Sequence, residues 1–475
     1  MTDALWTWQD LVDAAAGTAD GAPSNPITGF SIDTRSLQPG EVFVALRDQR
    51  DGHDFVGTAF ERGASAALVE TGYVRKPGDG ALLRVPDTLE GLRGVARAAR
   101  ARTDAKIIAV TGSVGKTGTK EALRACLGRL GPTHAAEKSF NNHWGVPLTL
   151  ARMPAGVRYG VFEIGMNHAG EITPLTQLVR PHVAIITTVE PVHLEFFGSV
   201  AAIAEAKAEI FDGLEPGGTA ILNRDNPHFA RLEERARSKG ARIVSFGLSE
   251  AADVHPESLA LKADGSDLEV QIAGKSISYR IGAAGAHIAQ NSLAVVAALD
   301  VLGTDVEAAV EAFAGMTAAK GRGARTEINV TDGAILLIDE SYNANPASMR
   351  SALAAMASVP RDKFPRRIAV LGDMLELGEQ SGSLHEGLKD SVDAAEVDLV
   401  FACGPNMERL FTALPASRRG DWASSSEGIL AALVGTVRSG DVVMVKGSLG
   451  SRMAPLVEAL MQKGQDDRVG LAAGK

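Results

Sequence analysis

Nine short apolar runs, separated by segments with helical patterns, decide what this 475-residue chain can fold into. Each run is bounded by turn-forming residues. Strands that are apolar on both faces belong to parallel sheets covered by helices on both sides, so the pattern predicts an α/β fold. The runs are KIIAV (106–110), YGVFEIG (159–165), VAIITT (183–188), TAILN (219–223), RIVSFG (242–247), AILLID (334–339), RIAVLGD (367–373), DLVFACG (398–404) and DVVMVKG (441–447).

The first of these runs leads into a glycine-rich turn, VTGSVGKTGTKEAL (110–123). The turn is irregular, because the general pattern G-x-x-x-x-G-K-[ST] would place its first glycine where this chain has Val110. Backbone N–H groups at the start of the following helix can still point at phosphate oxygens. Lys116 supplies a positive charge for the β and γ phosphates, and the hydroxyl of Thr117 can ligate Mg²⁺. A turn that binds nothing is the weaker alternative directly after a buried strand. The residues expected to surround the phosphates are Thr111, Gly112, Ser113, Val114, Gly115, Lys116, Thr117 and Gly118.

Length and two loosely composed segments predict three domains. At roughly 100–200 residues per domain, 475 residues make two to four domains. The segments RKPGDGALLRVPDTLEG (75–91) and GMTAAKGRGARTEI (315–328) have the composition of linkers. We therefore expect a small N-terminal α/β domain over residues 1–85, a central P-loop domain with a parallel sheet over residues 86–318 and a Rossmann-like α/β domain over residues 319–475.

Charge and composition exclude several classes of function. The net charge is −10 and long basic runs are missing, which argues against nucleic acid and anionic membranes as partners. Aromatic residues make up 5% of the chain, too few for a platform that stacks single-stranded bases. Two cysteines cannot build a disulfide framework, the N-terminus does not have the pattern of a signal peptide, and there is no run of 18 apolar residues. We therefore expect a cytoplasmic protein without a membrane span.

Three further residues of the central region point to metal chemistry. Glu163 ends the strand that follows the turn, His193 lies just beyond another strand, and Lys207 lies on a helix that begins near Val200. Taken singly, Glu163 can cap a helix, His193 can be an ordinary loop histidine, and Lys207 can be a solvated helix charge. A carboxylate and an imidazole at strand ends beside a phosphate-binding turn nevertheless fit a metal site better.

Longer motifs carry a resemblance to a known family. They are SIDTRSLQPGEVFVAL (31–46), SFNNHWGVPLTL (139–150), EIGMNHAGEI (163–172), DESYNANPASM (339–349), VLGDMLELGEQS (370–381) and VKGSLGSRM (445–453). With these motifs, and with a turn of the form T-G-[ST]-x-G-K-T, the chain resembles the Mur ligases of bacterial cell-wall synthesis from about residue 27 to residue 460. Within them it looks like the type that joins D-alanyl-D-alanine to UDP-N-acetylmuramoyl-tripeptide.

The resemblance implies an ATP-dependent amide ligase that works through an acyl phosphate. It also implies two Mg²⁺ ions: Thr117 and Glu163 would hold the first, and His193, Glu163 and Lys207 would surround the second. In this family the corresponding lysine is carbamylated by CO₂, so the same is expected of Lys207. Three domains joined by two linkers imply a hinge near residues 315–323 that closes over the reactants.

The resemblance also assigns residues to the nucleotide. Lys116 would hold the β and γ phosphates, and Asn291 would lie on the nucleotide side with His287 as a companion. Arg322 would reach the phosphates from the linker, with Arg325 as a rival. Two positions depart from the family pattern. Gly118 stands where many members have a second threonine, and the pair Asp339 and Glu340 stands in place of two aspartates, which leaves open which of them contacts the nucleotide.

For the other two substrates the resemblance gives further candidates. The expected uridine-diphosphate contacts are Thr34, Arg35 and Ser36, and the residues expected to face the muramoyl-peptide are Asn141, Asn142 and His168. Asn343 and Asn345 are candidates for binding the dipeptide. An equally good alternative for both asparagines is a strand-to-helix turn, where asparagine is common.

Three alternative functions remain at this point. A sister ligase or a folylpolyglutamate synthase would share the phosphate-binding turn and the lysine. A P-loop ATPase that regulates a partner protein would leave the metal-binding residues unexplained, and a non-catalytic UDP-sugar-binding protein would leave Lys116, Thr117 and Lys207 unexplained. A monomer is the expected state.

Overall fold

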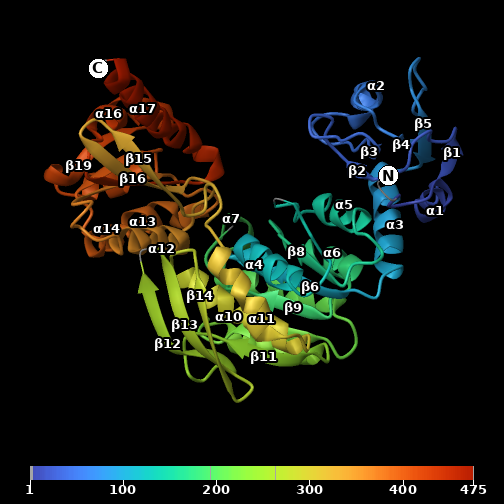
Figure 1. The fold of residues 1–475 in the computed structure, drawn as a ribbon, viewed down its shortest axis with the longest axis horizontal. Helices are drawn as coiled ribbons and strands as arrows, with labels where there is room; N and C mark the ends of the chain where they lie inside the picture. The colour runs from blue at the N-terminus through green and yellow to red at the C-terminus, as the bar shows by residue number, and fades with distance from the viewer. Residues whose placement is uncertain (1–3, 138, 193, 263, 474–475) are drawn as a thin grey trace.

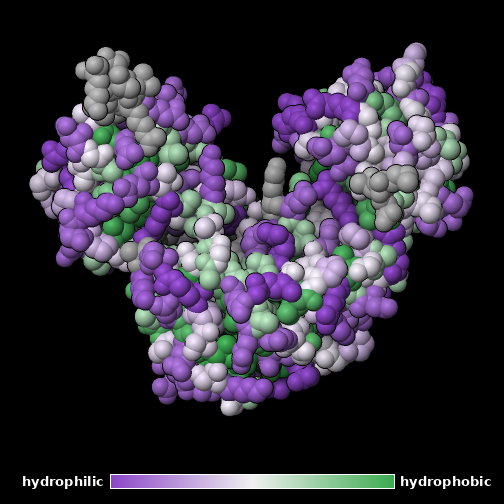
Figure 2. Space-filling model, in the orientation of Figure 1, coloured by the Kyte–Doolittle hydropathy of each residue, from purple (hydrophilic) through white to green (hydrophobic). Residues whose placement is uncertain are grey.

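The computed structural model describes residues 4–137, 139–192, 194–262 and 264–473, which form three lobes with one β-sheet each. The N-terminal and C-terminal lobes stand on either side of the central lobe (Figure 1). The space-filling view shows a cleft between the two outer lobes (Figure 2). This arrangement confirms the predicted α/β fold with three sheets. No helix in the described ranges is long and apolar enough to cross a lipid bilayer.

The N-terminal lobe has a five-stranded sheet in the order β1-β5-β4-β3-β2, in which only β1 is antiparallel to its neighbour. Its elements are α1 (Trp8–Ala14), β1 (Thr18–Asp20), β2 (Gly29–Ser31), β3 (Glu41–Val44), α2 (Val56–Glu61), β4 (Ala66–Glu70) and β5 (Ala81–Val85). Helix α3 (Thr88–Ala101) leads from this lobe to the next. Val95 and Ala99 pack in the N-terminal core, and Ala96 packs in the central one, so α3 joins the two lobes.

The central lobe has a nine-stranded sheet in the order β14-β13-β12-β11-β10-β9-β6-β8-β7. Its strands are β6 (Lys106–Thr111), β7 (Thr133–Ala135), β8 (Tyr159–Glu163), β9 (Val183–Ile186), β10 (Thr219–Asn223), β11 (Arg242–Phe246), β12 (Val254–Lys262), β13 (Gly265–Ile272) and β14 (Lys275–Ile281). Its helices are α4 (Lys116–Gly128), α5 (Gly145–Ala151), α6 (Ile172–Val179), α7 (Leu194–Phe197), α8 (Val200–Ala208), α9 (Phe229–Ser238), α10 (Ala286–Val301) and α11 (Val306–Val310).

Strand β6 is apolar on both faces because helices cover both. Ile108 and Val110 pack on the side of α4 and α10, whereas Ile107 and Ala109 pack on the side of α6 and α8. The parallel strands β8 and β9 flank β6. Both neighbours of β6 come later in the chain, so the strand order reverses at β6. In a parallel sheet, such a reversal opens a crevice at the carboxyl ends of the strands. The glycine-rich turn follows β6 at this point.

The C-terminal lobe has a six-stranded sheet in the order β15-β16-β20-β17-β18-β19, in which only β15 is antiparallel to its neighbour. Its strands are β15 (Ala324–Val330), β16 (Gly333–Glu340), β17 (Arg366–Gly372), β18 (Leu399–Cys403), β19 (Arg419–Ala423) and β20 (Asp441–Lys446). Its helices are α12 (Pro346–Ala357), α13 (Ser381–Glu386), α14 (Lys389–Ala394), α15 (Met407–Ala413), α16 (Ser426–Thr436) and α17 (Ala454–Ala473). All nine apolar runs of the sequence are strands in the central and C-terminal sheets.

Candidate active site

The turn at residues 111–118, here called the cradle, keeps its shape because two positions accept only glycine. A Cβ atom on Gly112 (φ +150°) would lie 1.9 Å from Thr187 Oγ1, and one on Gly115 (φ +85°) would lie 2.5 Å from Asn291 Nδ2. Both angles lie in the region that favours glycine. The backbone of the cradle therefore packs directly against β9 and α10, and Asn291 lies beside the first residues of α4.

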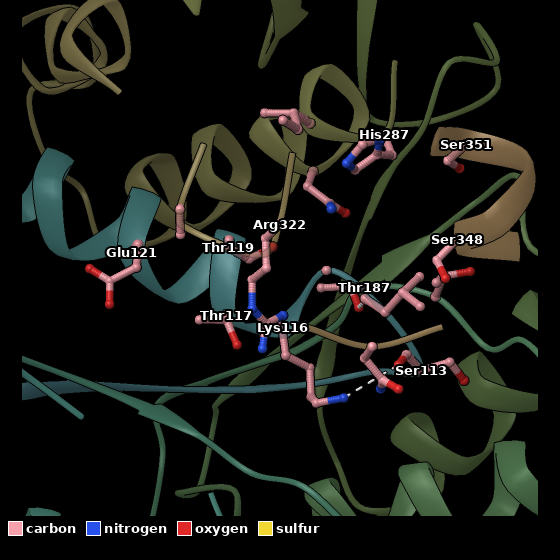
Figure 3. Close-up of a pocket in the computed structure, with 18 of the residues that line it drawn as sticks. Ser113, Lys116, Thr117, Thr119, Glu121, Thr187, His287, Arg322, Ser348 and Ser351 are labelled. Carbon is pink, nitrogen blue, oxygen red and sulfur yellow. Dashed lines mark hydrogen bonds between the residues drawn. The ribbon is translucent and has the colours of Figure 1, made fainter. Parts of the chain in front are cut away.

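Lys116 points along the cradle toward Ser113 (Figure 3). Its ammonium donates hydrogen bonds to the carbonyl oxygens of Gly112 (2.6 Å) and Ser113 (3.4 Å). Burial lowers the pKa of Lys116; the nearby Glu163 carboxylate opposes this shift, and the Arg322 guanidinium adds to it. Lys116, Glu163 and Arg322 thus influence one another electrostatically although they come from three distant parts of the sequence.

Glu163 is held by donors from two other segments. The Thr117 hydroxyl donates to Glu163 Oε2 (2.9 Å), and Asn141 Nδ2 donates to Glu163 Oε1 (2.7 Å). A hydroxyl and a carboxylate are oxygen ligands of the kind that Mg²⁺ prefers, so these side chains fit the ion that the sequence predicts. Within the described ranges no group of three or more His, Cys, Asp or Glu side chains is arranged to hold a metal. His193, which was expected to complete a second metal site, lies outside the described residues.

Lys207 is buried in α8, with 2% of its surface exposed, so it is not a solvated helix charge. Burial is the main reason that its pKa lies well below the usual lysine value, and the charge of Lys116 lowers it further. No side chain of the described part of the protein forms a hydrogen bond or an ion pair with its Nζ. Lys207 does not line the cavity in front of the cradle.

The cavity in front of the cradle has a volume of about 560 Å³ and is lined by both the central and the C-terminal lobe. The central lobe contributes the cradle, the ends of β8 and β9, and the start of α10 with His287 and Asn291. The C-terminal lobe contributes Glu340, the following loop with Tyr342, and Lys446. The predicted residues that line this cavity are Ser113, Val114, Gly115, Lys116, Thr117, Gly118, Asn141, Glu163, Asn291, Arg322, Glu340, Asn343 and Asn345.

Of the two linker arginines, Arg322 lies in the cavity and Arg325 does not. Arg322 donates to Ser139 Oγ (3.4 Å), and its guanidinium carbon lies 4.1 Å from the centre of the Tyr342 ring. Arg325 donates instead to the backbone oxygen of Ala355 (3.0 Å). The position of Arg322 therefore depends on both lobes.

The structure separates Asp339 from Glu340. Asp339 is buried and its carboxylate is occupied: Oδ1 accepts bonds from the N–H (3.1 Å) and hydroxyl (2.6 Å) of Ser341, and Oδ2 accepts one from Gly321 N–H (2.9 Å). Glu340 lines the cavity and pairs with Lys446 at 3.3 Å. Burial lowers the pKa of His287 across the cavity, and Glu340 opposes this shift. Glu340 is therefore the residue of the pair whose carboxylate faces this cavity.

The two asparagines expected to bind the dipeptide also have local roles. Asn345 caps α12: its Oδ1 accepts a hydrogen bond from Ser348 N–H (2.9 Å), and its own N–H donates to Ser348 Oγ (3.0 Å). Asn343 Oδ1 accepts a bond from Ala344 N–H (2.8 Å). Asn343 and Asn345 thus both stabilise the turn between β16 and α12 and line the cavity in front of the cradle.

Two candidates for the muramoyl-peptide lie outside the cavity. Asn142 Oδ1 accepts bonds from the N–H groups of Trp144 (3.3 Å) and Gly145 (2.9 Å) at the start of α5. His168 is exposed, 3.1 Å from Glu171, and its ring packs against Phe196. The third candidate, Asn141, lies between Glu163 and the cavity.

A second cavity of about 1480 Å³ lies between the N-terminal and central lobes. Thr34, Arg35 and Ser36 line it, together with Arg124 and Arg152 of the central lobe. Arg35 is paired with Asp33 at 2.7 Å. The three residues expected to contact uridine diphosphate therefore share one cavity with two cations from the neighbouring lobe.

Among the residues of the first cavity that sequence reasoning did not identify are Ser139, Glu190, Tyr342 and Lys446. Ser139, Tyr342 and Lys446 all belong to motifs that were quoted only for the family resemblance. Glu190 follows the apolar run 183–188 at the same sheet edge as Glu163. This position in the sequence could have identified it as a residue of the cavity.

Comparisons with known proteins identify the family. The family of the Mur ligase middle domain matches residues 110–299, and that of the Mur ligase, glutamate ligase domain matches residues 324–449. A curated relative, the UDP-N-acetylmuramoyl-tripeptide–D-alanyl-D-alanine ligase of Rickettsia prowazekii, is 33% identical over 430 residues, 90% of this chain and 94% of that protein. The crystal structure of MurF from Acinetobacter baumannii matches with a TM-score of 0.84 at 31% identity, over 96% of this chain and 99% of that one. The MurF ligase of Thermotoga maritima, solved in complex with ADP, matches with a TM-score of 0.77 at 26% identity, over 93% of this chain and 98% of that one. The chain therefore belongs to the Mur ligase family, and within it to the MurF branch.

Proposed function

We propose that this chain is an ATP-dependent ligase that joins D-alanyl-D-alanine to UDP-N-acetylmuramoyl-tripeptide, giving the UDP-muramoyl-pentapeptide precursor of peptidoglycan. The observation that carries the proposal is the meeting of the cradle, Glu163 and Arg322 at one cavity between two lobes. The curated relative bears the name of this ligase. The Thermotoga maritima neighbour was solved with ADP, which supports ATP as the nucleotide.

The reaction needs ATP because a carboxylate and an ammonium group do not condense in water. The γ-phosphoryl group passes to the terminal carboxylate of the tripeptide, and ADP leaves. The amine of the dipeptide then attacks the carbonyl carbon of the acyl phosphate, and phosphate leaves as the amide forms. Two anions must approach each other in the first step, so Lys116 and Arg322 act by neutralising charge at the cavity.

The oxygen atoms of Thr117 and Glu163 would hold one Mg²⁺ ion, which would supply positive charge to offset the negative charge of the phosphates. A second ion would be held by Glu163, His193 and Lys207. A lysine can ligate a cation only after CO₂ has added to its neutral amine and given it an anionic oxygen. The depressed pKa of Lys207 favours that neutral form.

The remaining assignments follow from position in the two cavities. Asn291 and Glu340 would contact the nucleotide from opposite lobes, with Glu340 near the ribose. The second cavity would bind the uridine diphosphate at Thr34, Arg35 and Ser36. We propose that the enzyme works as a monomer in the cytoplasm, where ATP and the UDP-linked precursor are present.

The test is phosphate release from Mg-ATP, with the UDP-muramoyl-tripeptide and D-alanyl-D-alanine added singly and together, followed by mass detection of the product. Release that requires both, with one pentapeptide formed per phosphate, is the expected result. Lys116→Met removes the cradle charge at similar size and should abolish release. If phosphate release required a single amino acid instead of the dipeptide, the chain would be a sister ligase. Phosphate release that depends on neither added substrate would refute the ligase proposal.

A further inference from the structure

Four carboxylates line the cavity in front of the cradle, and three of them have clear partners. Glu121 and Glu340 lie 2.6 Å and 3.3 Å from a lysine ammonium. Glu163 accepts the two hydrogen bonds described above. The fourth, Glu190, forms no ion pair with any residue that the structure describes, and only the Thr188 hydroxyl reaches its Oε1, at 3.4 Å.

Glu190 is fixed beside the cradle by its backbone. Its N–H donates to Ser113 Oγ (2.9 Å), and the Ser113 hydroxyl donates to its carbonyl oxygen (3.1 Å). Ser348 and Ser351 of α12 line the same cavity from the C-terminal lobe (Figure 3). The Glu190 carboxylate therefore belongs to a space bounded by the cradle on one side and by α12 on the other.

An unpaired carboxylate is unusual in this cavity, because a half-buried charge without a partner is costly. Burial is the main reason that the pKa of Glu190 is raised, although the Arg350 guanidinium and the Thr188 hydroxyl act in the opposite direction. ATP is an anion and the reacting end of the tripeptide is a carboxylate, so Glu190 repels both. Among the reacting groups of the three substrates, only the ammonium of the dipeptide is attracted to it.

We propose that Glu190 binds the ammonium group of the incoming D-alanyl-D-alanine and orients it toward the acyl carbon, in the space between the cradle and α12. This inference rests on the proposed function, which supplies the dipeptide. A charge-assisted hydrogen bond from the ammonium to Glu190 replaces water around both groups. It also explains why this carboxylate of the cavity forms no ion pair with a lysine or arginine that the structure describes, although the Arg350 guanidinium is close enough to act on its pKa.

The experiment compares wild type with Glu190→Gln, which keeps the shape and removes the charge, and with Glu190→Asp, which keeps the charge. We expect Glu190→Gln to raise the KM for D-alanyl-D-alanine about tenfold or more, equal to about 1.4 kcal/mol. The KM values for ATP and for the UDP-muramoyl-tripeptide should change less than about twofold. Glu190→Asp should recover part of the loss. The matched control is Glu205→Gln, an exposed α8 carboxylate paired with Arg231, which should leave all three KM values unchanged.

A second readout separates amine binding from a structural or metal-binding role. Without the dipeptide, hydroxylamine traps the acyl phosphate as a hydroxamate. Hydroxylamine is uncharged at neutral pH, so it does not need the Glu190 carboxylate. Glu190→Gln should form the hydroxamate at the wild-type rate and at the wild-type Mg²⁺ requirement. An unchanged dipeptide KM, a lost hydroxamate or a raised Mg²⁺ requirement would each overturn the inference. If the wild-type protein forms hydroxamate but never joins the dipeptide, the proposed acceptor is wrong and the inference fails with it.

Discussion

The cation–π contact between Arg322 and Tyr342 leads to a prediction about activity, and its geometry allows the expected loss to be estimated. The guanidinium carbon lies 4.1 Å from the ring centre, and the tyrosine is 39% exposed. Cation–π contacts contribute roughly 0.5–1 kcal/mol at exposed sites and about 2 kcal/mol when desolvated, so this one should contribute about 1 kcal/mol. Tyr342→Leu removes the ring and keeps an apolar side chain and the backbone bond to Gly321 (3.0 Å). If Arg322 then loses its orientation toward the phosphates, kcat/KM falls about fivefold.

Phosphate release under the conditions of the ligase assay measures this loss. Tyr342→Phe keeps the ring and should stay within about twofold of wild type, because the contact does not involve the hydroxyl. In an Arg322→Gln background, Tyr342→Leu should cost almost nothing more, since the two side chains act as a unit. An equal loss in both backgrounds, or an equal loss in Tyr342→Phe, would refute the idea that the ring acts through Arg322.

Four other substitutions give three independent tests. Gly118→Ala should raise the free energy of unfolding by about 0.5–1 kcal/mol and leave ADP affinity unchanged, because a Cβ there meets no atom within 4 Å; thermal melting with ADP titration checks both. Glu340→Gln should weaken ADP binding about tenfold in calorimetry without unfolding the protein. Asp339→Asn should lower the melting temperature instead, because its amide can accept from Ser341 but places an NH₂ group against the buried N–H of Gly321. Lys207→Met should abolish ligation yet stabilise the CO₂-free protein at neutral pH. The pKa of Lys207 is depressed in the folded wild type, so the unfolded chain binds the extra proton. The free energy of unfolding of the wild type therefore rises with pH up to about 10.4. Lys207→Met should lack this rise.

The sequence predicted nine apolar strands of the central and C-terminal sheets and missed the others, which include the short buried strands β3 and β4 of the N-terminal sheet. All nine apolar runs are strands, because a strand covered by helices on two sides shows no polar positions. The hairpin strands β12–β14 were not predicted: β12 is largely exposed along its length, and β14 alternates between exposed and buried residues. Strand β15, which pairs antiparallel with β16, lies in the segment interpreted as a linker. One-sided strands of this kind resemble loops in composition.

For the site, the limit was distance along the chain. The cradle could be recognised because its residues are contiguous in the sequence and because glycines followed by a lysine in this pattern indicate phosphate binding. The choice between Asp339 and Glu340 could not be made, since it depends on Ser341 and Gly321 occupying one carboxylate and Lys446 pairing with the other. These partners come from three segments, and only folding places them together.

The linker unites these observations, because it belongs to the cavity rather than merely joining two lobes. Gly321 (φ +77°) and Gly323 (φ +95°) flank Arg322, and a Cβ on Gly321 would lie 3.0 Å from Tyr342 Cβ. The N–H groups of Gly321 and Gly323 donate to the Oδ2 (2.9 Å) and backbone oxygen (2.8 Å) of Asp339, which fixes the linker to the end of β16. A rotation of the C-terminal lobe therefore moves Arg322, Tyr342 and Glu340 together relative to the cradle. We infer that such a rotation would move Arg322 and Glu340 away from the cradle in one motion, so that phosphoryl transfer would require both lobes to line the cavity as they do here.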